Sequence, residues 1–335
     1  MFPIENVLFF VGNGKSSECT CSSIHDNGAL YNSTFLVFCF FGIIFNWMSL
    51  LILIDKEHKL AVFTYLTVYT AMDLLHTIIL CLYVIVYIYL RDTSLFRLVE
   101  LLENFCTEVL NTIRIIAMLS ITLDRIVHLE MILGLRNSKK HSSQKRARVV
   151  MIITFVLCIC ANLPNLLMYK CGDVFLDPDI SFLHSQFYFS YNWIYFPLFY
   201  LIPSFFLIIG NMVLIILLRR ALQREHLKGK ATRRKNFTLT ITATVIILTF
   251  VVVQIPGYIA VRSHFISMAP SNMDANELKM VDFIIQIFRF VPALNSLANL
   301  FIYILLCPPF KRTLAKTLMD QRKKFGFRSS VIVGV

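Results

Sequence analysis

The chain has 335 residues, of which 57% are hydrophobic and only 16% are charged, and its formal net charge is +12. A soluble domain of this length carries more charge, whereas this composition is typical of proteins with long apolar membrane spans. The nine cysteines do not form a short-spaced framework, and no Cys/His spacing predicts a zinc site. We therefore expect a membrane protein with no metal and no cofactor.

Seven apolar segments, taken in chain order, each have the length of about 20 residues that a helix needs to cross a bilayer. They are Thr34–Ile54, Leu60–Leu90, Phe105–Leu129, Val149–Tyr169, Phe187–Leu218, Phe237–Val261 and Met280–Leu306. Lipid offers the backbone no hydrogen-bond partner, so the spans must be helices. The predicted fold is all-α, a seven-helix transmembrane domain over residues 34–306 between an extracellular segment, 1–33, and a cytoplasmic tail, 307–335.

The distribution of Lys and Arg sets the predicted orientation. With the N-terminus outside, the inner loops and tail carry 23 of these residues and the outer segments carry six. Positive charge accumulates on the cytoplasmic side, so we predict a plasma-membrane protein with its N-terminus outside and no nucleic-acid partner. Asn32, in an Asn-Ser-Thr sequon, then lies outside as a glycosylation candidate, unless the nearby first span blocks the transferase.

After the seventh span, Pro308 and Pro309 precede a stripe of apolar residues formed by Phe310, Leu314 and Leu318. Proline is well tolerated at a helix start, and basic residues occupy the other faces. This pattern predicts a short amphipathic helix that lies on the inner leaflet in contact with membrane lipid. The alternative is a frayed basic tail.

Charged side chains inside membrane spans are costly, so they mark either function or a paired structural core. In this chain they are Asp73, Arg114, Asp124, Arg125 and Arg289, accompanied by amides at Asn46, Asn111, Asn211, Gln254, Asn295 and Asn299. The adjacent Asp124 and Arg125 end the third span, where they could also be simple anchors at the membrane edge.

The order of these residues along the spans resembles the rhodopsin-like (class A) G-protein-coupled receptor family. The matching elements are Asn46, Ala71-Met72-Asp73-Leu74, Leu123-Asp124-Arg125-Ile126, Pro203, Pro256, Asn295-Ser296-x-x-Asn299-Leu300-x-x-Tyr303 and Phe310. Each element alone is weak, but their joint order across the seven spans is specific to the family.

The chain also departs from the family pattern. Ile126 replaces the Tyr that follows Asp-Arg, Leu300 replaces the seventh-helix Pro, and Val253-Gln254-Ile255-Pro256 replaces Cys-Trp-x-Pro. With these departures the chain resembles the nematode branch that holds FMRFamide-receptor-like proteins and serpentine chemoreceptors.

Arg114 lies 11 residues before Arg125, three turns along the same face of the third helix. The family has a small polar residue there, beside a second-helix carboxylate that holds a sodium ion in many members. Two unpaired buried charges would be very costly, so we hypothesise that Arg114 replaces the ion and pairs with Asp73. The alternative is that this pair only knits the helices together.

The predicted outer face, counted with Glu108 and Asp282 at the outer ends of their spans, carries 13 acidic residues against six basic ones, which favours a cationic ligand such as a basic peptide. Arg289, at pocket depth, would instead suit a ligand carboxylate or carbonyl, or form a salt bridge with Glu108 or Asp282. The predicted ligand pocket consists of Arg289, Glu108, Asn111, Gln254, Tyr258 and Gln286.

The resemblance also implies a disulfide between Cys171, just beyond the fourth span, and Cys106 on the third. Cys106 is closer to Arg125 than is usual in the family, by about six residues or ~9 Å of helix. Cys19 or Cys21 is an alternative partner.

The resemblance implies a signalling receptor rather than an enzyme, in which an extracellular neuropeptide or small chemosensory molecule leads to activation of a heterotrimeric G protein. The expected switch residues are Asp124, Arg125, Asp73, Arg114, Asn299, Tyr303, Asn46 and Pro256, and the sixth helix would swing away from the third on the inner side. A small-solute transporter is the alternative function, although its usual internal repeats and broken half-helices are not evident. A retinal pigment would need a lysine within the seventh span, and Lys279 lies only at its start.

Overall fold

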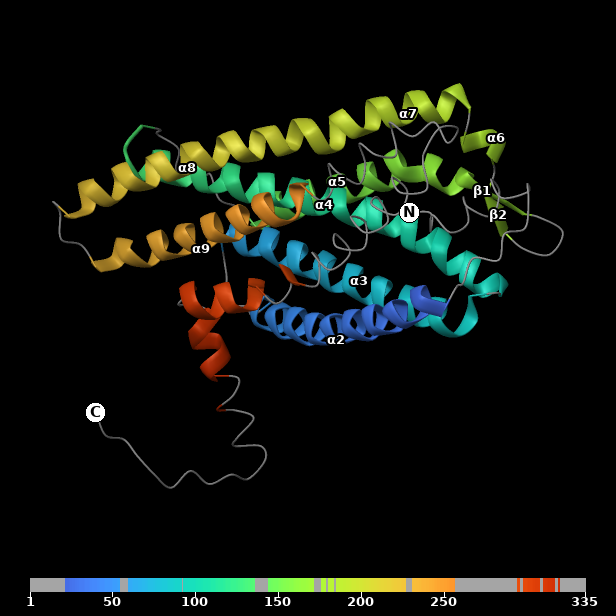
Figure 1. Ribbon diagram of the computed structural model, residues 1–335. Helices are drawn as coiled ribbons and strands as arrows, with labels where there is room; N and C mark the ends of the chain where they lie inside the picture. Colours follow the sequence, from blue (N-terminus) through green and yellow to red (C-terminus); the bar gives the residue numbers. More distant parts are fainter. Residues whose placement is uncertain are drawn as a thin grey trace, which may run out of the picture.

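A computed structural model describes residues 22–54, 60–91, 93–135, 144–171, 176–178, 180–183, 185–226, 231–256, 294–295, 298–307, 310–316 and 319. Long helices dominate this part of the chain and run alongside one another as a bundle (Figure 1). The helices are α2 (Ser22–Leu53), α3 (Ala61–Leu90), α4 (Ser94–Ile132), α5 (Gln144–Asn162), α6 (Ile180–Leu183), α7 (Gln186–Phe196), α8 (Ile202–His226) and α9 (Ala231–Val253). Residues 298–306 are also helical.

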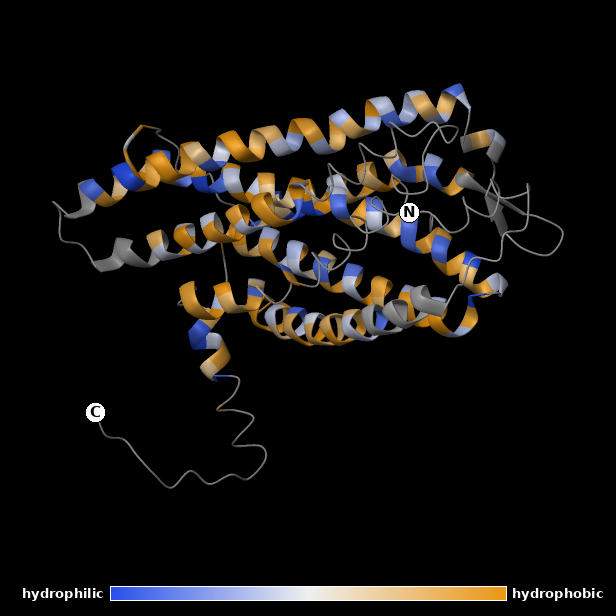
Figure 2. Cartoon of the chain, in the orientation of Figure 1, coloured by the Kyte–Doolittle hydropathy of each residue, from blue (hydrophilic) through white to orange (hydrophobic). Residues whose placement is uncertain are grey.

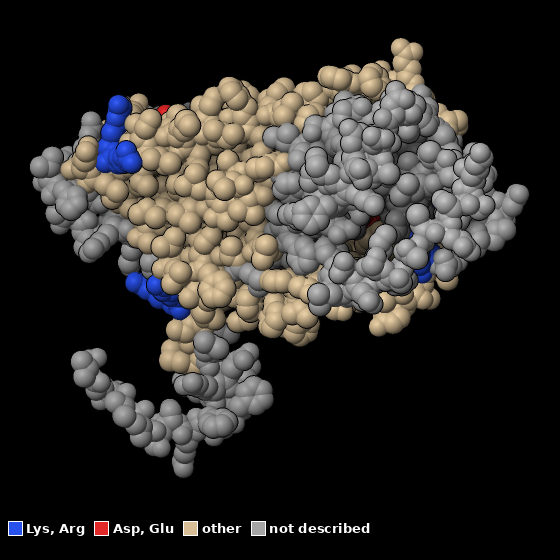
Figure 3. All heavy atoms as spheres, in the orientation of Figure 1, with Lys and Arg blue, Asp and Glu red and all other residues tan. Residues whose placement is uncertain are grey.

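The helices have the length and composition of membrane spans. Among the described residues, four helical stretches are long and apolar enough to cross a bilayer, namely Asn32–Leu53, Ala61–Leu90, Gln144–Leu167 and Gln186–Gln223. Hydrophobic residues cover the middle of the bundle, and the exposed Lys and Arg lie toward its two ends (Figures 2 and 3). Together with the shorter apolar stretch Phe237–Val253 and the helical residues 298–306, these elements confirm the predicted all-α class.

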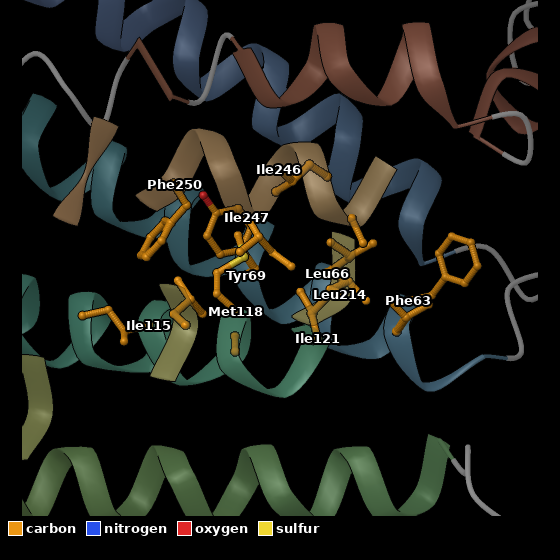
Figure 4. Close-up of a cluster of buried hydrophobic side chains, with 14 of the residues drawn as sticks. Phe63, Leu66, Tyr69, Ile115, Met118, Ile121, Leu214, Ile246, Ile247 and Phe250 are labelled. Atoms are coloured by element: carbon orange, nitrogen blue, oxygen red, sulfur yellow. The ribbon is translucent and has the colours of Figure 1, made fainter. Parts of the chain in front are cut away.

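The bundle core forms where α3, α4, α8 and α9 meet. Figure 4 shows Leu66 and Tyr69 of α3 beside Met118 and Ile121 of α4, with Phe250 of α9 closing the cluster. These side chains recur at helical spacing on each element, so each helix turns one apolar stripe inward. The polar site described below lies in the same α3–α4 interface, next to this packed layer.

Helix α4 begins 11 residues earlier than the predicted third span. The side chain of Thr93 caps its first turn, because its Oγ1 accepts a hydrogen bond from the backbone N–H of Phe96 at 3.4 Å. At 39 residues the helix is roughly 58 Å long, nearly twice the ~30 Å hydrocarbon core of a bilayer. The helix therefore extends beyond the lipid and carries Glu100 and Glu103 with it.

Helix α4 ends at a glycine. Gly134 has a positive φ of 69°, and Leu135 donates its backbone N–H to the Glu130 carbonyl at 2.9 Å. This is the reversal that commonly ends helices, and glycine adopts it without a steric penalty.

Prolines shape the fourth and fifth spans. The α-helix α5 tightens into the 3-10 helix η1 (Leu163–Met168) at Pro164. A π-helical turn, η2 (Pro197–Leu201), joins α7 to α8, so residues 186–226 form one continuous helix. Proline lacks the N–H that a regular turn needs, which explains why the pattern changes at these points.

Two further features complete the described fold. A small antiparallel hairpin of β1 (Tyr169–Cys171) and β2 (Leu176–Pro178) follows η1. The sequence pattern does not predict these strands. Residues 310–316 form the short helix predicted after the seventh span, at a steep angle to the bundle (Figure 1). Phe310 at its start is buried and stacks on Tyr303, with 5.2 Å between the ring centroids.

Candidate functional site

The centre of the bundle holds a charged pair between α3 and α4. Nη1 of Arg114 lies 2.6 Å from Oδ1 of Asp73, and the two side chains are 0% and 1% exposed. On α3, Tyr69, Asp73 and His76 follow one another at intervals of four and three residues, so they share the face that meets α4. The structure thus contains the pair that the sequence predicted.

A second guanidinium nitrogen of Arg114 also contacts polar side chains. Nη2 lies 3.1 Å from Nδ1 of His76 and donates to Oδ1 of Asn111, one turn earlier on α4. A guanidinium has donors and no acceptor, so Nδ1 of His76 must accept and its proton sits on Nε2. The cluster is electrically neutral, with one cation, one anion and a neutral imidazole.

The second oxygen of Asp73 ties the cluster to the seventh helix. Nδ2 of Asn299 donates to Oδ2 of Asp73 at 3.1 Å, and Nδ2 of Asn295 lies 3.4 Å from the same oxygen. The two amides also reach the Tyr69 hydroxyl, at 3.4 and 2.7 Å respectively. One carboxylate therefore links three helices: α3, α4 and the seventh.

His76 and Tyr69 belong to this cluster, although the sequence pattern did not predict either of them. A histidine or tyrosine inside an apolar run is a common core residue, so neither stands out alone. The signal that could have found them is their spacing from Asp73, which places all three on one face of α3. Tyr303, in contrast, was expected among the switch residues, and its hydroxyl lies 3.4 Å from Thr70 Oγ1.

A second charged pair lies near the C-terminal end of α4. Nε of Arg125 donates to Oδ2 of Asp124 at 3.1 Å, and Nη2 of Arg125 contacts the same oxygen. The side chains are 1% and 8% exposed. This pair lies within one helix, about 16 Å along the axis from Arg114.

Two contacts join neighbouring helices near the same end of the bundle. A Cβ added to Gly210 of α8 would lie 2.8 Å from Cγ2 of Thr122, so α8 packs directly on α4 here. Oγ1 of Thr242 on α9 lies 2.8 Å from the carbonyl of Leu306 and 2.8 Å from that of Thr238 in its own helix. The first contact fixes α8 against α4, and the second ties α9 to the end of the seventh helix.

The two remaining residues of the predicted switch, Asn46 and Pro256, are both described. Asn46 is fully buried in α2, and Pro256 is exposed three residues after α9 ends at Val253. The missing N–H of proline cannot support the preceding turn, which is consistent with that helix end.

The predicted ligand pocket is described in part. The Tyr200 hydroxyl donates to Oε2 of Glu108 at 2.7 Å, Asn111 contacts Arg114, and Gln254 is buried. The other three pocket residues, Tyr258, Gln286 and Arg289, lie outside the described residues.

The predicted disulfide is not seen. Cys106 is a free thiol in the first half of α4, and the side chain of Cys171 in β1 lies outside what the structure describes, so the bridge stays a prediction. Asn32 is half-buried within α2, and among the described residues no group of His, Cys, Asp and Glu could hold a metal ion.

These features define a polytopic helical membrane protein with a buried charged core and an Asp-Arg pair near the C-terminal end of one helix. A family model described as 7 transmembrane receptor (rhodopsin family) matches residues 45–303, which is more than half of the chain. The chain therefore belongs to the rhodopsin family of seven-transmembrane receptors, as its motifs predicted. No curated protein matches it significantly.

Proposed function

We propose that this receptor converts the binding of an extracellular ligand into activation of a heterotrimeric G protein at the plasma membrane, with its N-terminus outside. The observation that carries the proposal is the state of Arg125, which is 1% exposed and held by the adjacent Asp124 at the inner end of α4. A buried arginine paired within its own helix can be released without separating two helices. Family membership supports signalling over the alternative of solute transport.

The proposed mechanism is a shift between two arrangements of the bundle. In the described arrangement, α9 is tied to the seventh helix by the contact between Thr242 and the Leu306 carbonyl. A ligand that favours an outward position of α9 would break this contact and free Arg125 for the G protein, because a ligand shifts an equilibrium by its differential affinity for two states.

The proposed ligand is a neuropeptide or a small chemosensory molecule, in keeping with the resemblance to the nematode FMRFamide-receptor-like and chemoreceptor branch. The proposed pocket comprises Arg289, Glu108, Asn111, Gln254, Tyr258 and Gln286. The experiment is a screen of peptides and acidic metabolites in cells that express the receptor with a promiscuous G protein. Wild-type receptor should respond to a member of the panel, and Arg125→Ala, expressed at the same surface level, should not. An equal response from Arg125→Ala would contradict coupling through this face.

Arg114 is proposed to act as a resident cation at the centre of the bundle. Its guanidinium occupies the space beside Oδ1 of Asp73 and also contacts the amide of Asn111 and the imidazole of His76. A sodium ion therefore has no vacant position beside that carboxylate oxygen. We expect the wild-type response to be the same in sodium and in choline chloride, and Arg114→Ser to make it depend on sodium. If Arg114→Ser reaches the surface normally and stays indifferent to sodium, this role is wrong.

The proposed orientation has its own test. An epitope tag at the N-terminus should be detected by antibody on intact cells, and a tag in the loop after His226 should be detected only after permeabilisation. The reverse pattern would contradict the proposal. Removal of a glycan by Asn32→Gln, seen as a mass shift, would show that the sequon is used.

A further inference from the structure

The outer extension of α4 carries a buried polar stripe that is not part of the central cluster. Glu100, Glu103, Asn104 and Thr107 follow one another at helical spacing and share one face. The first three are buried, at 0%, 3% and 4% exposed, although they lie before the predicted third span. Two buried carboxylates require hydrogen-bond donors, because burial removes the water that would otherwise solvate them.

The hydrogen bonds within the stripe leave most of its acceptors unsatisfied. Thr107 donates to Oε1 of Glu103 at 3.2 Å, and Nη1 of Arg97 lies 3.3 Å from Oε2 of Glu100. Among the described residues, no hydrogen-bond partner reaches Oε1 of Glu100, Oε2 of Glu103 or either polar atom of Asn104. A buried polar group without a partner is costly, so the unliganded stripe is unfavourable.

The unpartnered atoms have a definite chemical character. Three are acceptors, on Glu100, Glu103 and Asn104, and one is a donor, Nδ2 of Asn104. Among the described residues, Arg97 is the cation that contacts the stripe, but its side chain is 26% exposed and it reaches Glu100 and not Glu103. Within the described part of the chain, two carboxylates therefore face one guanidinium. Burial raises the pKa of Glu100, and an added cation would offset that effect.

We propose that this stripe is a subsite for a guanidinium or ammonium group of the extracellular ligand. A guanidinium offers five N–H donors and no acceptor, and an ammonium offers three donors, which suits the two carboxylates and the three oxygens that lack a partner among the described residues. The subsite lies on the outer part of α4, beyond Glu108 and the central cluster. The assignment rests on the proposed receptor function, because it names the chemistry of the ligand.

The test uses charged thiol reagents as probes and requires no ligand. In purified receptor in nanodiscs, Asn104→Cys is treated with 2-aminoethyl methanethiosulfonate, a cation, or with its anionic 2-sulfonatoethyl counterpart, and modification is followed by intact mass. Clefts lined by one sign of charge raise the local concentration of counter-ions by about 10-fold or more, so the cation should react at least ~10-fold faster. Adding Glu103→Gln should reduce this preference several-fold. Wild-type receptor gives the background from native cysteines.

Two further variants keep the test decisive. Leu98→Cys is the matched control, because Leu98 is 43% exposed on another face of the same helix, and it should show no comparable preference. Thr107→Cys, one turn inward on the stripe, replaces Asn104→Cys if that variant does not fold. Equal rates for the two reagents, a preference for the anion, no reaction, or indifference to Glu103→Gln would each overturn the subsite. Labelling does not involve a G protein, so a failure of the proposed coupling would leave this result standing.

Discussion

Helix α4 carries two arginine–aspartate pairs that differ in what they connect. Arg114 reaches Asp73 on α3, so its pair spans two helices, and both side chains are fully enclosed. Arg125 contacts Asp124, the residue just before it, near the C-terminal end of the same helix. Breaking the first pair removes an ion pair that joins α3 to α4, whereas the second pair joins no second helix. From this difference we predict that the central pair contributes mainly to stability and the Asp124–Arg125 pair mainly to switching.

The central pair should show the largest effect. Arg114→Met keeps an unbranched side chain but removes the guanidinium, so Asp73 is left buried without its cation, a change that typically costs about 3–5 kcal/mol. Surface expression and thermal stability in detergent should fall sharply. Adding Asp73→Asn to Arg114→Met removes the unpaired charge and should restore much of the loss. If the double variant is no more stable than Arg114→Met alone, the pair is not a coupled unit.

The packing of α8 on α4 gives the next largest effect. Gly210→Ala places a methyl group 2.8 Å from Cγ2 of Thr122, too close for two carbon atoms, so the helices must shift. We expect a loss of roughly 1–3 kcal/mol, as for other overpacked cores, measured by thermal unfolding. Thr122→Ser removes that Cγ2 and keeps the hydroxyl that donates to the Met118 carbonyl, so the double variant should regain stability. No recovery would show that the contact is not the cause.

The contact between α9 and the seventh helix should have a smaller effect, and on signalling rather than stability. Thr242→Val keeps the branched shape but removes the hydroxyl that reaches the Leu306 carbonyl. A hydrogen bond is worth about 1 kcal/mol, so basal G-protein activation should rise by roughly five-fold.

Thr244→Val is the matched control for that prediction. The Thr244 hydroxyl donates to the Thr240 carbonyl within α9, at 2.8 Å, and joins no second helix among the contacts seen here. Its basal activity should equal that of wild type. Equal basal activity in Thr242→Val and Thr244→Val would mean that the contact with Leu306 does not restrain α9.

The sequence predicts the spans and the central pair because lipid imposes strict costs on both. Long apolar runs must be helices, and the buried charges Asp73 and Arg114 must find each other. It does not predict that α4 begins at Ser94, because Glu100 and Glu103 read as loop charge until the Thr93 cap and their burial are seen. His76 was missed because a lone core histidine carries no distinguishing signal, and the hairpin at Tyr169–Cys171 because three-residue strands leave almost no pattern.

The most direct test of the different roles of the two pairs is thermal unfolding of purified Arg114→Met and Arg125→Ala, measured side by side with wild type. The central pair joins two helices, so Arg114→Met should lower the melting temperature by roughly 5 °C or more. Arg125→Ala also leaves a carboxylate, Asp124, without its cation, but that pair joins no second helix, so it should lower the melting temperature less than Arg114→Met does while losing ligand-stimulated G-protein activation. Equal destabilisation by the two substitutions, or a stable Arg114→Met beside an unstable Arg125→Ala, would contradict the division of roles along α4.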